Sequence, residues 1–497
     1  MKINPLIQND FYKQSHYKQY PNDTQKVYSN LTARKSRIEG INTVVLFGMQ
    51  YFIKAYLMEE WQKNFFDKPW EDIEKKYLRI INATLGPGAV TTNHIKELHE
   101  LGYLPILIKA LPEGVSVPIR VPMMTITNTV NHAYWLVNYL ESIWSCITWQ
   151  PITSATIARE FRKVLDKYAL ETVGNADFCQ WQGHDFSFRG MSSLESACTS
   201  GAAHLLSFTG TDTIPAIEFL EQYYNANVEK ELVGASVPAS EHSCMCFGSK
   251  EGEIQTFERL LNIFPKGILS VVSDTWSLPN VICEILPKLK ERITTREGKL
   301  VIRPDSFWTD PVDCLCGFNG YHPQMEKLNP AEKLMIKKGL IESLWDIFGG
   351  TTTEKGYRVL APCIGAIYGD SITIERAERI CQRLKEKGFA SINAVYGIGS
   401  FTYQFNTRDT FGLAIKATYG IVDRKPIEVF KDPVTDDGMK KSAKGLIRVN
   451  GTNGNYTYKD CCTPEEEAGG ELKEIFRDGK LLIDYTLAEI RDRVKNG

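Results

Sequence analysis

The chain has 497 residues, too many for one ordinary hydrophobic core, so we expect two packed domains or one large barrel with additions. Hydrophobic residues make up 43% of the chain and charged residues 24%, a mix typical of a folded globular protein. The formal net charge of −2 excludes a global positive field, so we expect neither nucleic acid nor a membrane as a partner.

The N-terminal third mixes helical and strand-like segments. Residues 1–10 lack the apolar core of a secretory signal, and the most apolar stretch, residues 44–57, is interrupted by Gly48, Gln50 and Lys54. We expect a buried helix there rather than a membrane span. Apolar spacing predicts further helices over residues 135–149 and 155–174.

The twelve cysteines suggest reduced thiols, because the chain has no export signal, and we therefore expect a cytoplasmic protein. Three pairs lie close in sequence, at 244 and 246, 314 and 316, and 461 and 462. None has the two-residue gap of a zinc knuckle. We interpret them as small packed side chains rather than metal ligands.

From about residue 178 onward, short apolar segments alternate with helical patterns. The predicted strands cover residues 267–275, 299–306, 363–371, 392–400 and 413–422. Strand–helix alternation indicates a parallel sheet, either open or closed as a barrel. The last part of the chain looks like a small β-rich addition whose lysines form a solvated face.

Polar residues follow four of these predicted strands directly, as Ser273-Asp274, Arg303-Pro304-Asp305, Gly369-Asp370 and Gly397-Ile398-Gly399-Ser400. In a barrel the carboxyl ends of the strands converge on one face, where active sites form. Carboxylates can accept from ribose hydroxyls or hold Mg²⁺, and arginine and glycine amides can bind phosphate. Each Asp alone could be a helix N-cap, but the set favours a phosphate-and-hydroxyl site.

Three further motifs precede these strand ends. In "HDFSFRGMSSLESA" (184–197), alternation predicts that His184, Phe186 and Phe188 share one face of a strand, with Arg189 beginning the turn. "GTDT" (210–213) is a tight polar turn before a helix. In "PASEHSCMC" (238–246) the small polar neighbours of His242 indicate a loop; the alternatives are a metal site or a nucleophile with its base.

Eight motifs, in chain order, resemble the nicotinamide phosphoribosyltransferase family: "NDFYKQSHYKQYP" (9–21), "HDFSFRG", "GTDT", "SVPASEHS", "SVVSD" (270–274), "IRPDS" (302–306), "YGD" (368–370) and "VFKDP" (429–433). The resemblance covers nearly the whole chain. It implies a type II phosphoribosyltransferase-like α/β fold, an irregular barrel with a second α+β, β-rich domain formed from both chain ends. We expect the N-terminal part over residues 1–150, the barrel over 151–425 and the C-terminal part over 426–497.

The resemblance also implies an activity, the transfer of phosphoribose from phosphoribosyl pyrophosphate to nicotinamide in NAD salvage. The products are nicotinamide mononucleotide and pyrophosphate, with Mg²⁺ as cofactor and stimulation by ATP through a phosphohistidine. A homodimer with active sites at its interface is expected. The alternative on the same fold is nicotinate phosphoribosyltransferase; a barrel lyase or aldolase and a non-catalytic binding protein are more distant alternatives.

The resemblance assigns roles residue by residue. It implies that Phe186 and, from a partner subunit, Tyr12 clamp the pyridine ring, and that Asp212, Arg303 and Ser270 complete the nicotinamide site. An Asp212 carboxylate would repel nicotinate and so favour nicotinamide. From the residues alone, Phe186 is as well explained by core packing and Asp212 by a turn.

For catalysis, the resemblance implies that ATP phosphorylates His242, that Glu241 is an orienting or Mg²⁺-linked carboxylate, and that Asp274 and Asp305 lie near the ribose and hold Mg²⁺. A structural histidine is the alternative for His242. The implied ribose and phosphate contacts are His184, Arg189, Gly369, Asp370, Gly399, Ser400, Arg34, Arg408, Lys416 and Lys431.

Two features depart from the family pattern. Ser400 stands where vertebrate members carry a phosphate-facing glycine; a serine can serve there if the backbone needs no positive φ. Extra sequence occupies residues 314–330, between the Arg-Pro-Asp strand and its helix. We expect a surface excursion at this insertion.

Overall fold

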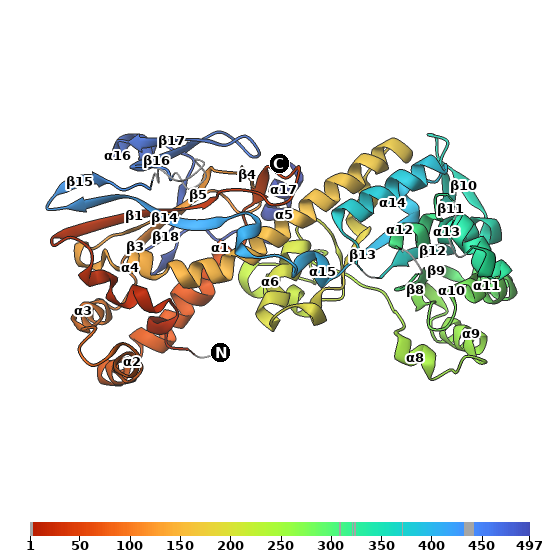
Figure 1. The fold of residues 1–497 in the computed structure, drawn as a ribbon, viewed down its shortest axis with the longest axis horizontal. Helices are drawn as coiled ribbons and strands as arrows, with labels where there is room; N and C mark the ends of the chain where they lie inside the picture. Colours follow the sequence, from red (N-terminus) through yellow and green to blue (C-terminus); the bar gives the residue numbers. More distant parts are fainter. Residues whose placement is uncertain (1–2, 308–309, 321, 323–324, 370, 432–441) are drawn as a thin grey trace. The chain divides into compact units, whose positions relative to one another are not determined.

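A computed structural model describes residues 3–307, 310–320, 322, 325–369, 371–431 and 442–497 (Figure 1). The chain divides into two compact units: residues 1–156, 219–227 and 406–497 form the first, and residues 157–218 and 228–405 the second. Both chain ends therefore build one unit, as the sequence predicts. The boundaries fall at 156 and 405 rather than 150 and 425, and the first unit also takes residues 219–227.

The first unit is built on a seven-stranded sheet in the order β15-β14-β1-β5-β3-β18-β19. Its neighbouring strands are antiparallel. The strands are β1 (Thr24–Ala33), β3 (Ile106–Ala110), β5 (Pro122–Asn128), β14 (Leu413–Val422), β15 (Lys425–Glu428), β18 (Lys473–Arg477) and β19 (Lys480–Leu481). The smaller pairs are β2 (Thr43–Val45) with β4 (Ser116–Pro118) and β16 (Leu446–Asn450) with β17 (Thr457–Cys462).

Strand β14 corrects the sequence prediction, which assigned residues 413–422 to the barrel. It pairs along its whole length with β1, from Ala33 opposite Leu413 to Thr24 opposite Val422. Local periodicity shows that a segment is a strand, but it does not show which sheet edge accepts it. The chain therefore leaves the second unit before β14 rather than after it.

Helix α4 (Leu136–Tyr139) covers one face of this sheet, and the β16–β17 pair with helix α16 (Pro464–Ala468) covers the other. Helix α4 contacts β1 and β5, where the Ser29 hydroxyl lies 2.8 Å from Asn138 Oδ1. On the other face, Tyr28 and Leu446 line one hollow with Pro464 of α16. The other helices of this unit include α2 (Trp70–Leu85), α3 (Asn93–Leu101) and α17 (Leu487–Lys495). The short helix α1 (Met49–Phe52) continues as π-helix through Glu60.

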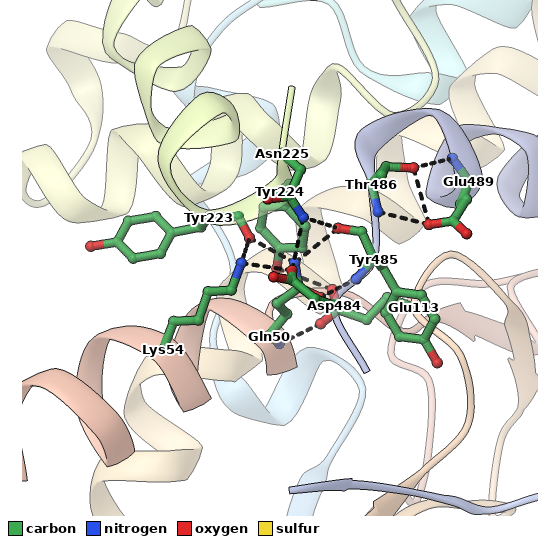
Figure 2. Close-up of polar contacts among 10 residues, drawn as sticks. All are labelled: Gln50, Lys54, Glu113, Tyr223, Tyr224, Asn225, Asp484, Tyr485, Thr486 and Glu489. Carbon is green, nitrogen blue, oxygen red and sulfur yellow. Dashed lines mark hydrogen bonds and ion pairs between the residues drawn. The ribbon is translucent and has the colours of Figure 1, made fainter. Parts of the chain in front are cut away.

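Residues 219–227 join the first unit through a polar cluster (Figure 2). Gln50 donates to the carbonyls of Tyr223 (2.7 Å) and Tyr485 (2.9 Å), and its own oxygen accepts from the Tyr485 amide. Lys54 donates to the Tyr223 carbonyl at 3.0 Å and to Asp484 at 2.7 Å. Three segments far apart in sequence are thereby held together by hydrogen bonds and an ion pair.

Glu113 lies at the centre of the same cluster and is 2% exposed. Its carboxylate accepts from the Gly48 amide at 2.9 Å, from the Gln50 amide at 2.5 Å and from the Tyr224 hydroxyl at 3.1 Å. Burial raises the pKa of Glu113 to about 7, against the opposite effect of these donors.

The second unit is built on a six-stranded parallel sheet that curls into a half-barrel, in the order β7-β6-β13-β12-β9-β8. Its strands are β6 (Gly183–Asp185), β7 (Gly210–Thr211), β8 (Lys266–Val272), β9 (Glu297–Arg303), β12 (Ile364–Tyr368) and β13 (Ala394–Ile398). The predicted irregular α/β barrel rhythm is confirmed for the four strands that carry the polar motifs.

Helices connect these parallel strands, because a parallel pair needs a crossover. They are α6 (Leu194–His204), α7 (Ile214–Tyr224), α8 (His242–Cys246), α9 (Glu253–Ile263), α10 (Leu278–Asn280), α11 (Leu286–Thr295), α12 (Pro311–Cys316), α13 (Pro330–Phe348) and α14 (Ile374–Glu386). Helix α5 (Glu141–Thr172) precedes β6, and α15 (Ser400–Tyr403) follows β13. Two of the four unit boundaries fall within α5 and α7. A small hairpin, β10 (Gly350–Thr352) with β11 (Arg358–Leu360), follows α13.

The expected surface excursion at residues 314–330 is wrong for its first part. Cys314 and Cys316 are buried within α12, which packs against α13 and α14 (Figure 1). The Arg383 guanidinium pairs with Asp313 and donates to the Gly317 carbonyl at 2.9 Å. The apolar run of α12 therefore serves as core, a role that its position in an insertion did not indicate.

Candidate active site

A cavity of about 320 Å³ lies along the inner face of the parallel sheet. On β9, Leu300 and Ile302 are buried in the core, whereas the alternating Lys299, Val301 and Arg303 line the cavity. The front half, at the carboxyl ends of the strands, is lined by His184, Phe186, Asp212 and Arg303. The middle is lined by Ser270, Val301, Ile367 and Val395, and the rear half by Phe178, Trp181, Lys299 and Ile392.

Phe186 and His184 together form a wall of the front half. The Arg303 guanidinium carbon lies 4.7 Å from the Phe186 ring centre, and the His184 ring centre is also 4.7 Å from it. Gly397 leaves room for the Phe186 ring beside β13, because a Cβ at this position would lie 2.7 Å from Phe186 Cδ2. Strand β6 ends at Asp185, and Phe188 belongs to a 3₁₀ turn, Phe188–Gly190. The predicted strand face therefore does not extend to Phe188.

Asp212 is fixed by two donors on one carboxylate oxygen. Its Oδ1 lies 2.8 Å from His184 Nε2 and accepts from the Ser236 hydroxyl at 2.6 Å. Burial alone would raise the pKa of Asp212, but these contacts and the charge of Arg303 hold it below its ordinary value. The carboxylate therefore stays ionised, and no described residue hydrogen-bonds its Oδ2.

Asp274 follows β8 directly and organises the loop after β9. Its Oδ2 accepts from the Asp305 amide at 2.9 Å, the Ser306 amide at 2.7 Å and the Ser306 hydroxyl at 2.6 Å. Its Oδ1 is buried and accepts no hydrogen bond within the described ranges. One oxygen thus holds the loop while the other remains for a charged group.

His242 is the side chain that faces this oxygen. Its Nε2 lies 3.3 Å from Asp274 Oδ1, and its side chain is 48% exposed against 5% for Asp274. Strand-like pairing positions it: the Ser270 amide donates to the Pro238 carbonyl and the Ser240 amide to the Ser270 carbonyl, both at 2.9 Å. The segment before His242 therefore runs beside β8 and delivers the imidazole to the end of that strand.

Glu241 lies next to this pair and contacts the Ser243 hydroxyl. Asp274, which sequence spacing does not connect to His242, is the carboxylate within reach of the imidazole. The carboxylate that faces the imidazole therefore comes from the end of a strand and not from the residue next to it.

Asp305, Arg303 and Gly369 meet at the ends of β9 and β12. Arg303 Nε lies 3.4 Å from Asp305 Oδ1. A Cβ at Gly369 would lie 1.9 Å from that same oxygen, so only glycine fits without displacing Asp305. Asp370, which follows Gly369 and belongs to the predicted site, lies outside the described residues.

The glycine-containing segment after β13 tolerates Ser400. Gly399 has a φ of −93°, and Ser400 is not among the described residues of positive φ. A Cβ at Gly190 would lie 2.0 Å from Ser400 Oγ, so the serine packs against the turn that carries the exposed Arg189. The condition for a serine at this position is therefore met.

Five predicted site residues belong to the first unit. Tyr12 is exposed, with its hydroxyl 3.2 Å from Asp10, and Arg408 and Lys431 are also exposed. Arg34 and Lys416 line one hollow of about 220 Å³ together with Arg120, a cation that the sequence did not indicate.

Sequence reasoning also missed Ser236 and Lys299. Ser236 lies inside the "SVPASEHS" motif, where attention to His242 hid a second polar side chain. Lys299 alternates with Val301 and Arg303, so the period of two along β9 was the available signal.

Comparisons with known proteins agree with this geometry. Residues 181–480 match the nicotinate phosphoribosyltransferase (NAPRTase) family, and residues 4–81 match the N-terminal domain of nicotinamide phosphoribosyltransferase. A protein of Acinetobacter baylyi named nicotinamide phosphoribosyltransferase is 48% identical, over 99% of this chain and 97% of its own. A protein of the same name from Mycoplasma pneumoniae is 37% identical, over 90% and 97%.

Two solved structures share the fold. Nicotinate-nucleotide pyrophosphorylase from Pyrococcus furiosus superposes with a TM-score of 0.55 at 14% identity, covering 99% of this chain and 95% of its own. Human nicotinic acid phosphoribosyltransferase superposes with a TM-score of 0.52 at 12% identity, covering 98% and 93%. Separately, none of the described helices has the length and apolarity needed to cross a lipid bilayer.

The half-barrel and the polar carboxyl edge of its sheet define an enzyme of the type II phosphoribosyltransferase class. Within that class, the chain belongs to the nicotinamide phosphoribosyltransferases of the nicotinate phosphoribosyltransferase family.

Proposed function

We propose that this protein transfers the phosphoribosyl group of phosphoribosyl pyrophosphate to nicotinamide, and so acts in NAD salvage. The observation that carries the proposal is the front half of the cavity. It offers the aromatic face of Phe186 beside the carboxylate of Asp212. Both donors to this carboxylate contact Oδ1, so Oδ2 can accept from a ligand. A planar amide fits this pair, since the ring stacks and the amide NH₂ donates to the carboxylate.

In the reaction, the pyridine nitrogen attacks the anomeric carbon of the ribose. The bond from that carbon to pyrophosphate breaks, and its electron pair leaves with pyrophosphate. Positive charge develops first on the ribose and then on the pyridinium ring. The carboxylate of Asp305 and the π face of Phe186 would stabilise that charge.

We propose that Asp274 and Asp305 hold Mg²⁺. The buried Asp274 Oδ1, which accepts no hydrogen bond among the described residues, is a suitable hard oxygen donor. When bound there, Mg²⁺ would neutralise charge on the departing pyrophosphate. We infer that His184, Arg189, Gly369, Gly399 and Ser400 contact the ribose and its phosphates, and that Asp370 joins them.

We further propose that ATP phosphorylates His242. The position of His242 supports it: Nε2 is the ring nitrogen that lies 3.3 Å from Asp274 Oδ1, which leaves Nδ1 as the nitrogen that can attack phosphorus. Nδ1 would attack the γ-phosphorus, forming an N–P bond as the bond to ADP breaks. Glu241, the residue before His242, would serve as an orienting or Mg²⁺-linked carboxylate.

We propose a cytoplasmic homodimer with active sites at its interface, to which a partner subunit contributes Tyr12 and in which Arg34, Arg408, Lys416 and Lys431 serve as basic residues. Tyr12 would form the second ring of the clamp, and the four cations would bind phosphate. The hollow that joins Arg34, Arg120 and Lys416 supports an anion-binding role.

The test is to incubate the purified chain with nicotinamide and phosphoribosyl pyrophosphate, with Mg²⁺ and with or without ATP. We expect nicotinamide mononucleotide and pyrophosphate in equal amounts. If neither product forms under any of these conditions, the proposed activity is wrong. Sedimentation of the same sample measures the oligomeric state, and a monomer at working concentration would refute the dimer.

The ATP proposal has a separate test. His242→Ala should abolish ATP hydrolysis and ATP stimulation while leaving product formation without ATP measurable. The matched control is His132→Ala, an exposed histidine of the first unit. If His242→Ala hydrolyses ATP like the control, the phosphohistidine proposal is wrong and the transferase activity is unaffected by that result.

Nicotinate is the alternative substrate, because the family match carries that name. An ionised Asp212 disfavours it, since two carboxylates would face each other. Replacing Asp212 with serine should therefore relax selection against nicotinate by about tenfold, measured as the ratio of kcat/KM for the two substrates. An unchanged ratio would remove Asp212 from the specificity argument.

A further inference from the structure

The cavity is longer than its front half requires. Lys299 and Arg303 line it from the same strand four residues apart, which corresponds to roughly 13 Å along β9. A pyridine ring held between Phe186 and Asp212 leaves the rear half open. The volume of about 320 Å³ also lies within the range of cavities that bury larger ligands.

The rear half has its own chemistry. Phe178 and Trp181 supply aromatic surface, and Ile268 and Ile392 supply aliphatic surface. Trp181 and Ile268 are 44% and 45% exposed, so solvent reaches the cavity from this end. The rear half is therefore an apolar, partly aromatic space that a small molecule can enter independently of the front half.

Lys299 is the charged group of this space. Its stem lies against β12, because a Cβ at Gly365 would be 3.1 Å from Lys299 Cδ. Across the strand pair it stands next to Ile268, and the nearby Glu297 pairs with Lys266 at 2.6 Å instead. No ion pair to Lys299 is found in the part of the chain that the structure describes.

The two halves of the cavity carry different charged groups: Asp212 and Arg303 in the front half and Lys299 in the rear half. Burial lowers the pKa of Lys299, an effect that the nearby Cys363 only partly offsets. A half-buried ammonium without a counter-ion gains from any anion that enters beside it. At the front, the ionised Asp212 lies in the same space as Arg303, so an anion there meets a carboxylate as well as a cation.

We propose that the rear half of the cavity is a binding site for small aromatic carboxylates, whose ring packs against Trp181 and Phe178 while the carboxylate contacts Lys299 Nζ. Nicotinate is the member of this class closest to the proposed substrate. Bound there, its ring lies away from Phe186 and Asp212, so it is held without being converted. This inference rests on the proposed function only in assigning nicotinamide to the front half.

The experiment is a calorimetric titration of the full chain with nicotinate, and separately with benzoate, which lacks the ring nitrogen needed for transfer. Both should bind saturably to one site per chain. Lys299→Met, which keeps the length of the side chain, should weaken binding of both by about tenfold or more. Lys299→Arg should retain it within about threefold, and the control Lys290→Met, on an exposed helix position, should not change it.

Nicotinamide titrated into the same variants separates this proposal from the proposed function. We expect Lys299→Met to bind nicotinamide normally, whereas Phe186→Ala should lose nicotinamide and keep nicotinate. If Phe186→Ala loses nicotinate while Lys299→Met keeps it, nicotinate binds at the front and the inference is wrong. It is also wrong if neither carboxylate binds the wild-type chain. Failure of nicotinamide alone to bind would count against the proposed function only.

Discussion

Asp274 in the second unit and Glu113 in the first unit are both carboxylates with almost no exposed surface, and both accept backbone N–H donors. They differ in how their oxygens are used. Both oxygens of Glu113 accept hydrogen bonds from within the first unit (Figure 2). Asp274 concentrates three donors on Oδ2 and turns Oδ1 to an exposed histidine.

The difference separates a carboxylate that holds a fold from one that serves a site. Glu113 is fully occupied by the chain, so replacing it should affect stability. Asp274 keeps half of its capacity for a group that can change charge, so replacing it should affect reactivity. Substitutions at the two positions should therefore have opposite consequences.

The largest effect is expected for Asp274→Asn. An asparagine can place its carbonyl oxygen where Oδ2 accepts its three donors, so the thermal midpoint should stay within a few degrees. It removes the negative charge beside His242 and the proposed Mg²⁺ ligand. We expect kcat to fall by about 1,000-fold, roughly 4 kcal/mol of barrier. Steady-state kinetics measure the fall in kcat, and thermal unfolding of the same sample measures the midpoint. A large fall in the midpoint with an unchanged kcat would show that Asp274 serves the fold and not the site.

The next effect concerns the pH dependence of stability. Because the folded-state pKa of Glu113 is raised from 4.5 to about 7, the folded protein keeps a proton that the unfolded chain releases. Its contribution is fully present below pH 4.5 and is lost as pH rises through about 7. The loss amounts to at most about 3 kcal/mol. Unfolding of wild type and Glu113→Gln across pH 4.5–8 isolates it, since glutamine does not titrate.

At pH 5, Glu113→Gln itself should be less stable than wild type by about 2 kcal/mol. The hydroxyl oxygen of a protonated Glu113 can still accept a hydrogen bond, whereas the NH₂ of glutamine cannot, and whichever way the amide is placed this NH₂ faces a backbone donor, either Gly48 or Gln50. The folded enzyme should keep its kcat, because the cluster belongs to the first unit and contains no proposed site residue. A variant of wild-type stability with reduced kcat would contradict the assignment of Glu113 to the fold.

A smaller effect is expected for Ser236→Ala. It removes one of two donors to Asp212 Oδ1, so the carboxylate stays ionised but is held less firmly in the position that accepts from the amide NH₂. We expect the preference for nicotinamide over nicotinate, as a ratio of kcat/KM, to fall about fivefold. Ser187→Ala, at a buried serine outside this contact, is the matched control. Equal preferences in both variants would show that His184 alone fixes Asp212.

The smallest effect is expected for Ser400→Gly. The position does not require a positive φ, so glycine relieves no strain, and the backbone amide remains available. We expect KM for phosphoribosyl pyrophosphate to change by less than about threefold. A larger change would show that the serine hydroxyl itself binds phosphate.

Much of the second unit could be predicted from the sequence. Strand–helix alternation and the position of polar residues directly after apolar runs are local signals, and they predicted the ends of β8, β9, β12 and β13. The resemblance then assigned Phe186, Asp212 and Arg303 to one site, and the cavity brings those three together. Alternation along β9 also contained Lys299, although its role was not recognised.

Tertiary structure alone decided the remaining features. The pairing of β14 with β1, the return of residues 219–227 to the first unit, and the contact of His242 with Asp274 join segments distant in sequence. Periodicity reports which face of an element is apolar, but not which partner buries it. Sequence therefore determined the elements and the chemistry at their ends, while long-range packing determined which of those groups could meet.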